Sequence, residues 1–126
     1  MFRQRLDEEK RVLEAIEIAR RAAEVAADKQ ASEIVLLDVR DVCSFADYLV
    51  ICSGDSDRQL EAIWEDVRGA LKRDGVSIHH TEGTADSGWI VIDAGEVVVH
   101  IFATVRRDYY QLDTLWEKAV PLVRLQ

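Results

Sequence analysis

Acidic, aromatic and imidazole side chains occur together in one short apolar stretch, GWIVIDAGEVVVHIF at residues 88–102. Asp93 and His100 are types that could exchange a proton, and Trp89 could stack on a ligand. If Asp93 lies opposite Glu96 in a hairpin, Trp89 lies opposite His100, and the two rows are about 13 Å apart. No serine or cysteine nucleophile is evident beside His100. The stretch therefore favours a binding surface over a catalytic site.

Alternation of side chains along the two strands sorts this stretch into two faces. One face is wholly aliphatic, and we expect helices to cover it; its members are Ile90, Ile92, Val97, Val99 and Ile101. The other face mixes aromatic, acidic and aliphatic groups; its members are Trp89, Val91, Asp93, Glu96, Val98, His100 and Phe102. Such a mixture is typical of a protein interface, so this face is the predicted partner-binding surface. The alternative is that Trp89 and Phe102 are core residues beneath the last helix.

A second candidate site is the segment CSGDS at residues 52–56, between an expected strand and an expected helix. Backbone amides at a helix start attract anions. However, the segment lacks a phosphate-binding glycine motif and a nearby lysine, and Asp55 and Asp57 would repel phosphate. We expect a strand-to-helix turn in which Ser56 caps the helix, with Gln59 at capping-box spacing. A phosphate-handling enzyme is the alternative.

Metal, cofactor and disulfide chemistry is not predicted. Cys43 and Cys52 are too few for a disulfide framework, and their separation matches no paired zinc-ligand spacing. His79 and His80 are neighbours on an expected strand, so they point to opposite sides and cannot hold one metal together.

The acidic charge is concentrated in residues 31–126. Residues 1–30 hold seven basic and seven acidic side chains, whereas the rest hold nine basic and seventeen acidic ones, which accounts for the whole net charge of −8. A body this acidic repels nucleic-acid phosphates and attracts a basic protein partner.

The sequence also predicts where the protein is found. No apolar run approaches the about 20 residues of a membrane span. The first residues, MFRQRLDEEK, contain no apolar signal core. We therefore expect a cytoplasmic protein.

Hydrophobic periodicity predicts three helices and about five strands along the chain. The helices are expected over residues 5–29, 56–75 and 108–119, the last ended by Pro121. The strands are expected over residues 34–39, 47–53 and 76–80 and in the 88–102 hairpin, with a polar loop over 81–88. The stripe of the first helix is thin and alanine-rich, so we expect it to pack lightly.

This order predicts the α/β class, with a small mixed sheet of about five strands and helices packed against it. We expect a single domain, residues 1–126, in which residues 1–30 form a charged N-terminal helix and residues 31–126 form the α/β domain.

Three blocks of the chain resemble the signature motifs of the ribosomal silencing factor family, also called RsfS or Iojap-like. The blocks are SFADYLVICSGDSDRQLEAI, EGTADSGWIVIDAGEVVVHIF and RRDYYQLDTLW. Besides the partner-binding surface, the matching positions are Ser44, Asp47, Tyr48, Ser53, Gly54, Ser56, Gly95, Arg107, Tyr110, Leu115 and Trp116. The long charged N-terminal segment and the doubled Tyr109-Tyr110 depart from the family pattern.

The resemblance implies a translational repressor that is not an enzyme. Such a factor binds the large ribosomal subunit through its fourteenth protein and sterically blocks joining of the small subunit. The implied fold is similar to nucleotidyltransferases without their catalytic site, and it implies no cofactor, no membrane and little direct nucleic-acid contact. Trp89 would be the anchor, and Asp93 and Glu96 would pair with basic side chains. The alternatives are a nucleotidyltransferase-like enzyme and a homodimeric adaptor.

Overall fold

The fold is that of a computed structural model, which describes residues 14–106 and 119–125. Three sets of expectations fall outside this range. They are residues 5–13 of the N-terminal helix, residues 108–118 of the final helix, and the motif positions Arg107, Tyr110, Leu115 and Trp116.

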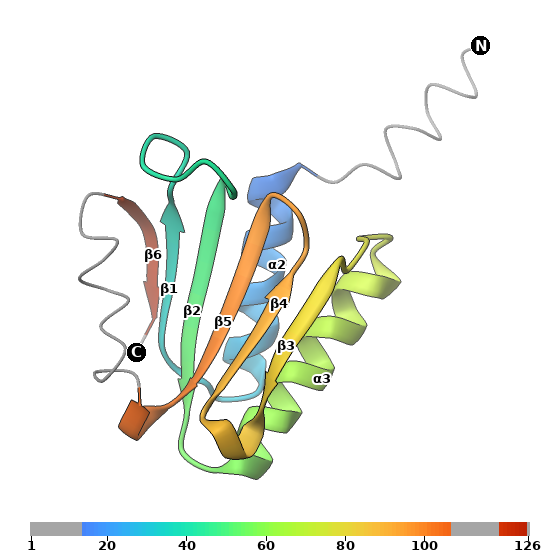
Figure 1. Cartoon of the computed structure of the whole chain (residues 1–126), viewed down its shortest axis with the longest axis vertical. Coiled ribbons are helices and arrows are strands. Elements are labelled where there is room, and N and C mark those ends of the chain that lie inside the picture. The colour runs from blue at the N-terminus through green and yellow to red at the C-terminus, as the bar shows by residue number, and fades with distance from the viewer. Residues whose placement is uncertain (1–13, 107–118, 126) are drawn as a thin grey trace.

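The described strands form one mixed sheet in the order β3-β4-β5-β2-β1-β6 (Figure 1). The strands are β1 Ser32–Asp38, β2 Tyr48–Gly54, β3 His80–Thr84, β4 Trp89–Asp93, β5 Val97–Ala103 and β6 Val120–Leu125. β2 and β5 run parallel, and every other neighbouring pair is antiparallel. The sheet confirms the predicted α/β class and has one strand more than expected.

Two helices, α2 (Ala15–Asp28) and α3 (Asp57–Arg73), lie on the same face of the sheet (Figure 1). In α3 the buried residues recur at helical spacing; they are Leu60, Ile63, Val67, Ala70 and Leu71. In α2 they are Ala19, Ala22, Ala23, Val25 and Ala26. Because alanine has a short side chain, the backbone of α2 can approach its neighbours closely. The light packing expected of this helix is therefore wrong from Ala19 to Ala26, where the inner stripe is buried, whereas Ile16 is only partly buried.

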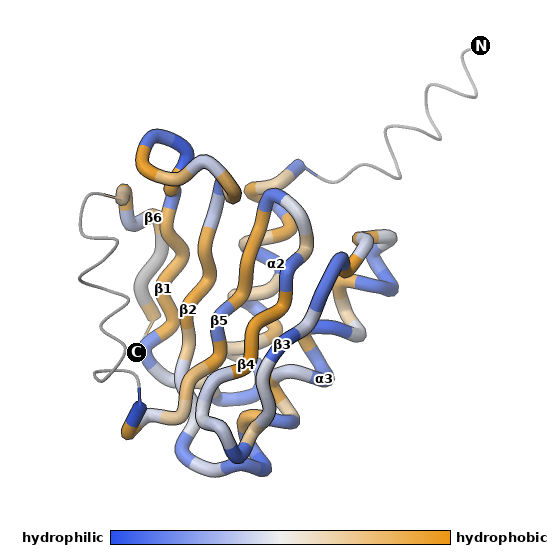
Figure 2. Tube along the Cα trace, in the orientation of Figure 1, coloured by the Kyte–Doolittle hydropathy of each residue, from blue (hydrophilic) through white to orange (hydrophobic). Residues whose placement is uncertain are grey.

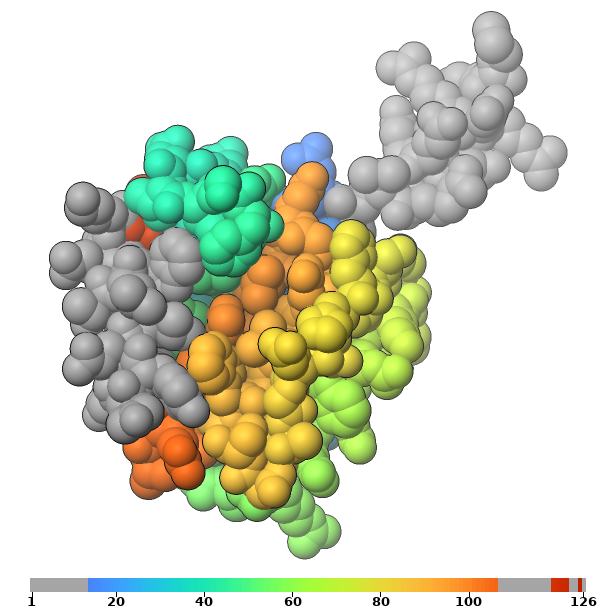
Figure 3. Space-filling model, in the orientation of Figure 1, coloured from blue at the N-terminus to red at the C-terminus, as the bar shows by residue number. Residues whose placement is uncertain are grey.

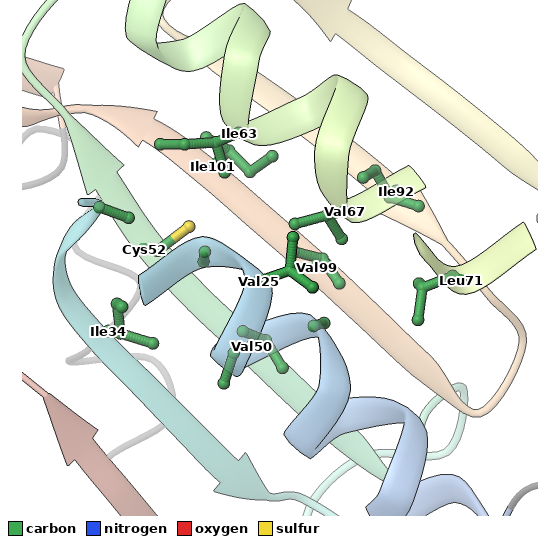
Figure 4. Packing of buried hydrophobic residues seen from close by; sticks show 14 of the residues in the cluster. Val25, Ile34, Val50, Cys52, Ile63, Val67, Leu71, Ile92, Val99 and Ile101 are labelled. Carbon is green, nitrogen blue, oxygen red and sulfur yellow. The ribbon is translucent and has the colours of Figure 1, made fainter. Parts of the chain in front are cut away.

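The larger hydrophobic cluster fills the space between the sheet and these two helices (Figure 4). The predicted aliphatic face of the hairpin lies here, and none of its five side chains is more than 3% exposed. Figure 2 shows that the central strands are hydrophobic along most of their length, whereas β3 at the edge is mostly polar. Because this aliphatic face packs against the helices, only the opposite face of the hairpin is left to contact a partner.

The third strand lies four residues later than predicted. Residues 76–79 belong to no strand, and β3 instead occupies residues 80–84, of which 81–84 were expected to belong to a polar loop. Val76 and Ile78 still pack against the helix-side core, which explains their apolar character. β3 pairs only with β4 among the described strands, so its exposed polar residues need no hydrophobic partner.

Strand β6 was not predicted, because Pro121 was expected to end a helix. Pro121 instead pairs with Leu37 of β1, next to a shift in register between Leu36 and Leu37. Proline cannot donate a ladder hydrogen bond, and it is tolerated where a strand lies at the edge of a sheet or beside a bulge. Both conditions hold here.

Gly83 of β3 is expected to be indispensable for stability. Its φ is +86°, and a Cβ atom there would lie 2.0 Å from the carbonyl oxygen of Trp89. Gly83→Ala should therefore lower the free energy of unfolding by about 2 kcal/mol or more, measured by urea denaturation.

A matched control for that substitution is Gly69→Ala in α3. The added Cβ would meet only the flexible end of Arg73, at 3.2 Å. Because alanine favours the helical state, this variant should gain about 0.5–1 kcal/mol. Equal stabilities for the two variants would contradict the backbone geometry at Gly83.

Candidate functional site

The two strands of the hairpin pair two residues away from the predicted register. Trp89 lies opposite Phe102, and Val91 lies opposite His100. The expected pairs, Asp93 with Glu96 and Trp89 with His100, are wrong. A shift by two residues preserves the alternation of side chains, so the strand residues keep their predicted faces although the partners differ. Glu96 is the exception, because it lies in the turn before β5.

The hairpin turn explains the shift. The backbone N–H of Ala94 donates to the carbonyl of Val97 at 2.9 Å, so the turn is centred on Gly95 and Glu96, one residue later than expected, and this moves the pairing by two residues. The N–H of Gly95, which has φ +87°, donates to Oδ1 of Asp93 at 2.8 Å. Asp93 is therefore partly engaged in shaping the turn. In the strand pairing Asp93 lies opposite Val98, and His100 lies opposite Val91.

The sheet face opposite α2 and α3 is called the open face below. By the strand pairing it carries His80, Glu82 and Thr84 from β3, Trp89, Val91 and Asp93 from β4, and Val98, His100 and Phe102 from β5. It faces the viewer in Figure 3, where β3 is yellow and β4 and β5 are orange. Exposure falls across it, from the exposed residues of β3 through the half-buried ones of β4 to buried residues in β5.

Three rings are stacked together on the open face. Trp89 packs on Phe102 with ring centroids 5.1 Å apart, and His100 packs on Phe102 at 6.1 Å. The indole Nε1–H of Trp89 donates to Nδ1 of His100 at 3.1 Å. These contacts hold the half-buried indole in one orientation, so it needs little further ordering when a partner binds.

The same hydrogen bond defines the state of His100. An indole N–H can only donate, so Nδ1 of His100 accepts and the ring proton lies on Nε2. Burial lowers the pKa of His100 to about 4. The ring is therefore neutral at neutral pH and serves to position Trp89.

Phe102 and Val98 are corrections to the predicted partner-binding surface. Phe102 is completely buried and Val98 is 7% exposed, within a second hydrophobic cluster on this side of the sheet. They lie too deep to contact a partner and support the surface from below. The core alternative is thus right for Phe102, whereas Trp89 stays half-buried at the surface.

A hollow of about 230 Å³ lies beside the indole on the open face. Its lining residues are Glu82, Gly83, Ser87, Trp89 and Val91. Sequence reasoning missed Glu82, Gly83 and Ser87, because the segment before the hairpin was expected to be a loop. The alternation of polar and small residues over 80–84 was the one available signal for a strand there.

Glu96 lies away from this hollow, at the far end of the hairpin. Its carbonyl oxygen accepts from the N–H groups of Asp47 and Tyr48, at 2.7 and 3.1 Å. Tyr48 is buried, and the guanidinium of Arg40 lies over its ring at 5.5 Å. The motif residues Asp47 and Tyr48 therefore contact the hairpin at its turn. That Glu96 and Trp89 both belong to one partner-binding surface stays a prediction.

The segment 52–56 is a strand-to-helix turn, as predicted. Ser56 caps α3, because its Oγ accepts from the N–H of Gln59 at 3.1 Å. The side chain of Gln59 accepts from the N–H of Asp55 at 2.7 Å, one residue earlier than in a standard capping box. Ser53 is fully buried, and a Cβ on Gly54 would lie 3.0 Å from Leu60. The turn thus brings α3 close to β2.

The remaining motif positions and the cysteines have simple surroundings. Ser44 lies exposed in the loop between β1 and β2. Neither Cys43 nor Cys52 forms a disulfide. Across residues 14–106 and 119–125, no group of three or more His, Cys, Asp or Glu side chains is arranged to hold a metal ion. Within the same ranges, the helices fall short of the length and apolar character required to cross a membrane.

Comparison with known proteins identifies the family. The family model described as "Ribosomal silencing factor during starvation" matches residues 12–126. The chain belongs to the ribosomal silencing factor family. It is 38% identical over 104 residues to the Bacillus subtilis protein named "Ribosomal silencing factor RsfS", with 82% of this chain and 87% of that protein covered. The resemblance carried by the three motif blocks is thereby confirmed.

Two further relatives extend the family in sequence and in structure. A crystal structure of a Chromobacterium violaceum protein superposes with a TM-score of 0.80 at 36% identity, covering 83% of this chain and 88% of that one. The Zea mays protein named "Protein Iojap, chloroplastic" is 28% identical over 109 residues, which are 86% of this chain and 47% of that protein. The family is named for silencing and not for a reaction.

The low pKa of His100 predicts an acid-dependent loss of stability. The ordinary histidine pKa is 6.5, so between about pH 6.5 and pH 4 the unfolded chain binds a proton that the folded chain excludes. Lowering the pH from 7 to about 5 should then cost about 2 kcal/mol through this residue. Above pH 6.5 the residue contributes no such loss.

His100→Asn isolates this effect, because asparagine offers an acceptor near the position of Nδ1 but does not titrate. Urea denaturation at pH 7 and pH 5 measures how much the free energy of unfolding of each protein falls between the two pH values. The fall should be larger for the wild-type protein than for His100→Asn. Equal losses would contradict a buried neutral histidine.

Proposed function

We propose that this protein represses translation by binding the large ribosomal subunit through its fourteenth protein, where it sterically blocks joining of the small subunit. Membership of the silencing factor family supports this proposal. The observation that carries it here is the half-buried indole of Trp89, fixed by His100 and Phe102 on the open face. A preorganised aromatic side chain is the usual anchor of a protein interface.

The charge of the protein supports a protein contact over an RNA contact. The chain carries a net charge of −8, and Glu82 and Asp93 belong to the open face. Acidic groups repel rRNA phosphates and attract the basic proteins that ribosomes contain. The repressor would act in the cytoplasm, where ribosomal subunits join, and its action needs shape and residence time without a cofactor.

Sedimentation through a sucrose gradient tests this proposal. The protein should travel with free large subunits, and an excess of it should reduce the fraction of joined ribosomes when small subunits are added. If the protein stays at the top of the gradient at both low and moderate salt, the proposed function is wrong.

A further inference from the structure

We propose that the hollow beside Trp89 receives an arginine side chain of the partner protein, whose stem lies against Val91 and whose guanidinium stacks on the indole of Trp89 and pairs with Glu82. This inference rests on the proposed function and adds the chemistry of the contact. It follows from the lining of the hollow, the contacts of Glu82 and the charges nearby.

The lining of the hollow combines an apolar floor with one acidic side chain. Trp89 and Val91 supply the apolar part. Among the described lining residues Glu82 is the one ionisable side chain, and none is basic. The hydroxyl of Ser87 is already engaged in hydrogen bonds, because it donates to the carbonyl oxygen of Thr84 at 2.7 Å and accepts from the N–H of Thr84 at 3.2 Å. A ligand therefore needs an apolar stem and a positive end.

Glu82 is available for a stronger partner than its present one. Its described ion-pair contact is with Nε2 of His80 at 3.4 Å, and the two side chains are 75% and 61% exposed. A contact of that length between exposed groups contributes little, and it depends on protonation of the histidine. An arginine could replace it with two parallel hydrogen bonds to the carboxylate.

The surrounding charges favour a cation in the hollow. Asp86 precedes the lining residue Ser87 in the chain, and its carboxylate accepts from Oγ1 of Thr84 at 2.6 Å. Arg106 is the described cation that approaches this region, with its Cγ over Gly88, but it does not line the hollow. A nucleic-acid base could stack on the same indole, but its phosphate would meet Glu82 and Asp86.

Arginine fits this combination better than lysine does. Its planar guanidinium stacks on an aromatic ring while its donors match a carboxylate, whereas lysine carries a strongly hydrated point charge. The hollow offers both features, the indole of Trp89 and the carboxylate of Glu82, on neighbouring strands.

The direct test is a titration with the blocked tripeptide Gly-Arg-Gly and its citrulline analogue, which has the same shape without the charge. The Trp89 indole N–H resonance should shift saturably with the arginine peptide, and the citrulline peptide should bind about fivefold more weakly. Glu82→Gln should remove this preference, and Glu65→Gln on α3 should keep it. Equal binding of both peptides, or a stronger shift with an oligouridine, would overturn the inference.

Sedimentation with large subunits separates this inference from the proposed function. Glu82→Gln should weaken binding about fivefold or more, and Glu65→Gln should leave it unchanged. If wild type and Glu82→Gln bind large subunits equally well, the arginine pocket is wrong while the proposed function stands. If wild type binds no large subunits but still prefers the arginine peptide, the proposed function fails and the pocket stands.

Discussion

Replacing Trp89 with alanine is expected to lower the affinity for the large ribosomal subunit by about 30-fold or more while the protein stays folded. The indole is half-buried, so its truncation removes surface that a partner would cover. It also removes the stacking on Phe102 and the donor to His100. Sedimentation or surface plasmon resonance measures the affinity, and circular dichroism checks the fold.

The chain offers a matched control in Trp64, which lies on α3 and packs against the helix-side core. Its Nε1 is buried and has no hydrogen-bond partner among the described residues, so Trp64→Phe removes an N–H donor without breaking a described hydrogen bond. This variant should bind large subunits as wild type does. If Trp64→Phe weakens binding and Trp89→Ala does not, the binding face has been assigned to the wrong side of the sheet.

Phe102→Ala is expected to lower the free energy of unfolding by about 3–5 kcal/mol, because the ring is completely buried and its loss leaves a cavity. Urea denaturation measures this change. Phe102→Leu should retain most of the volume, cost less stability and keep large-subunit binding. The assigned supporting role is contradicted if Phe102→Ala is as stable as wild type and yet fails to bind.

The sequence predicted which side chains share a face but not how the strands pair. Ile90 and Ile101 were assigned correctly to the helix side, because alternation is a local property of each strand. The register depends on the turn, which is centred on Gly95 and Glu96, and the side chain of Asp93 accepts from the N–H of Gly95 in that turn. A contact of this kind has no counterpart in hydrophobic periodicity.

The edge strands were the least predictable elements, for two physical reasons. β3 is polar because one of its sides has no neighbour among the described strands, and β6 contains Pro121, which usually signals an end. For the same reason, only part of the candidate site was predicted from the sequence. Trp89 and Val91 were recognised in a hydrophobic strand, whereas Glu82 came from the polar edge strand beside them.

The burial of Phe102 could not be read from the sequence either. Its face of the sheet carries a second hydrophobic cluster that joins residues far apart in the chain, such as Val35, Leu49 and Ala119. Whether an aromatic residue on this face is exposed depends on those distant segments. Composition alone therefore could not separate the buried Phe102 from the half-buried Trp89.

Site-specific photo-crosslinking to large subunits tests most directly which face binds and what it contacts. A benzoyl-phenylalanine in place of His80, which is exposed on the open face, should crosslink to the fourteenth protein of the large subunit. The same group in place of Glu65, which is exposed on α3, should give no crosslink. Crosslinks from position 65 and not from position 80, or crosslinks from position 80 to rRNA alone, would contradict the account.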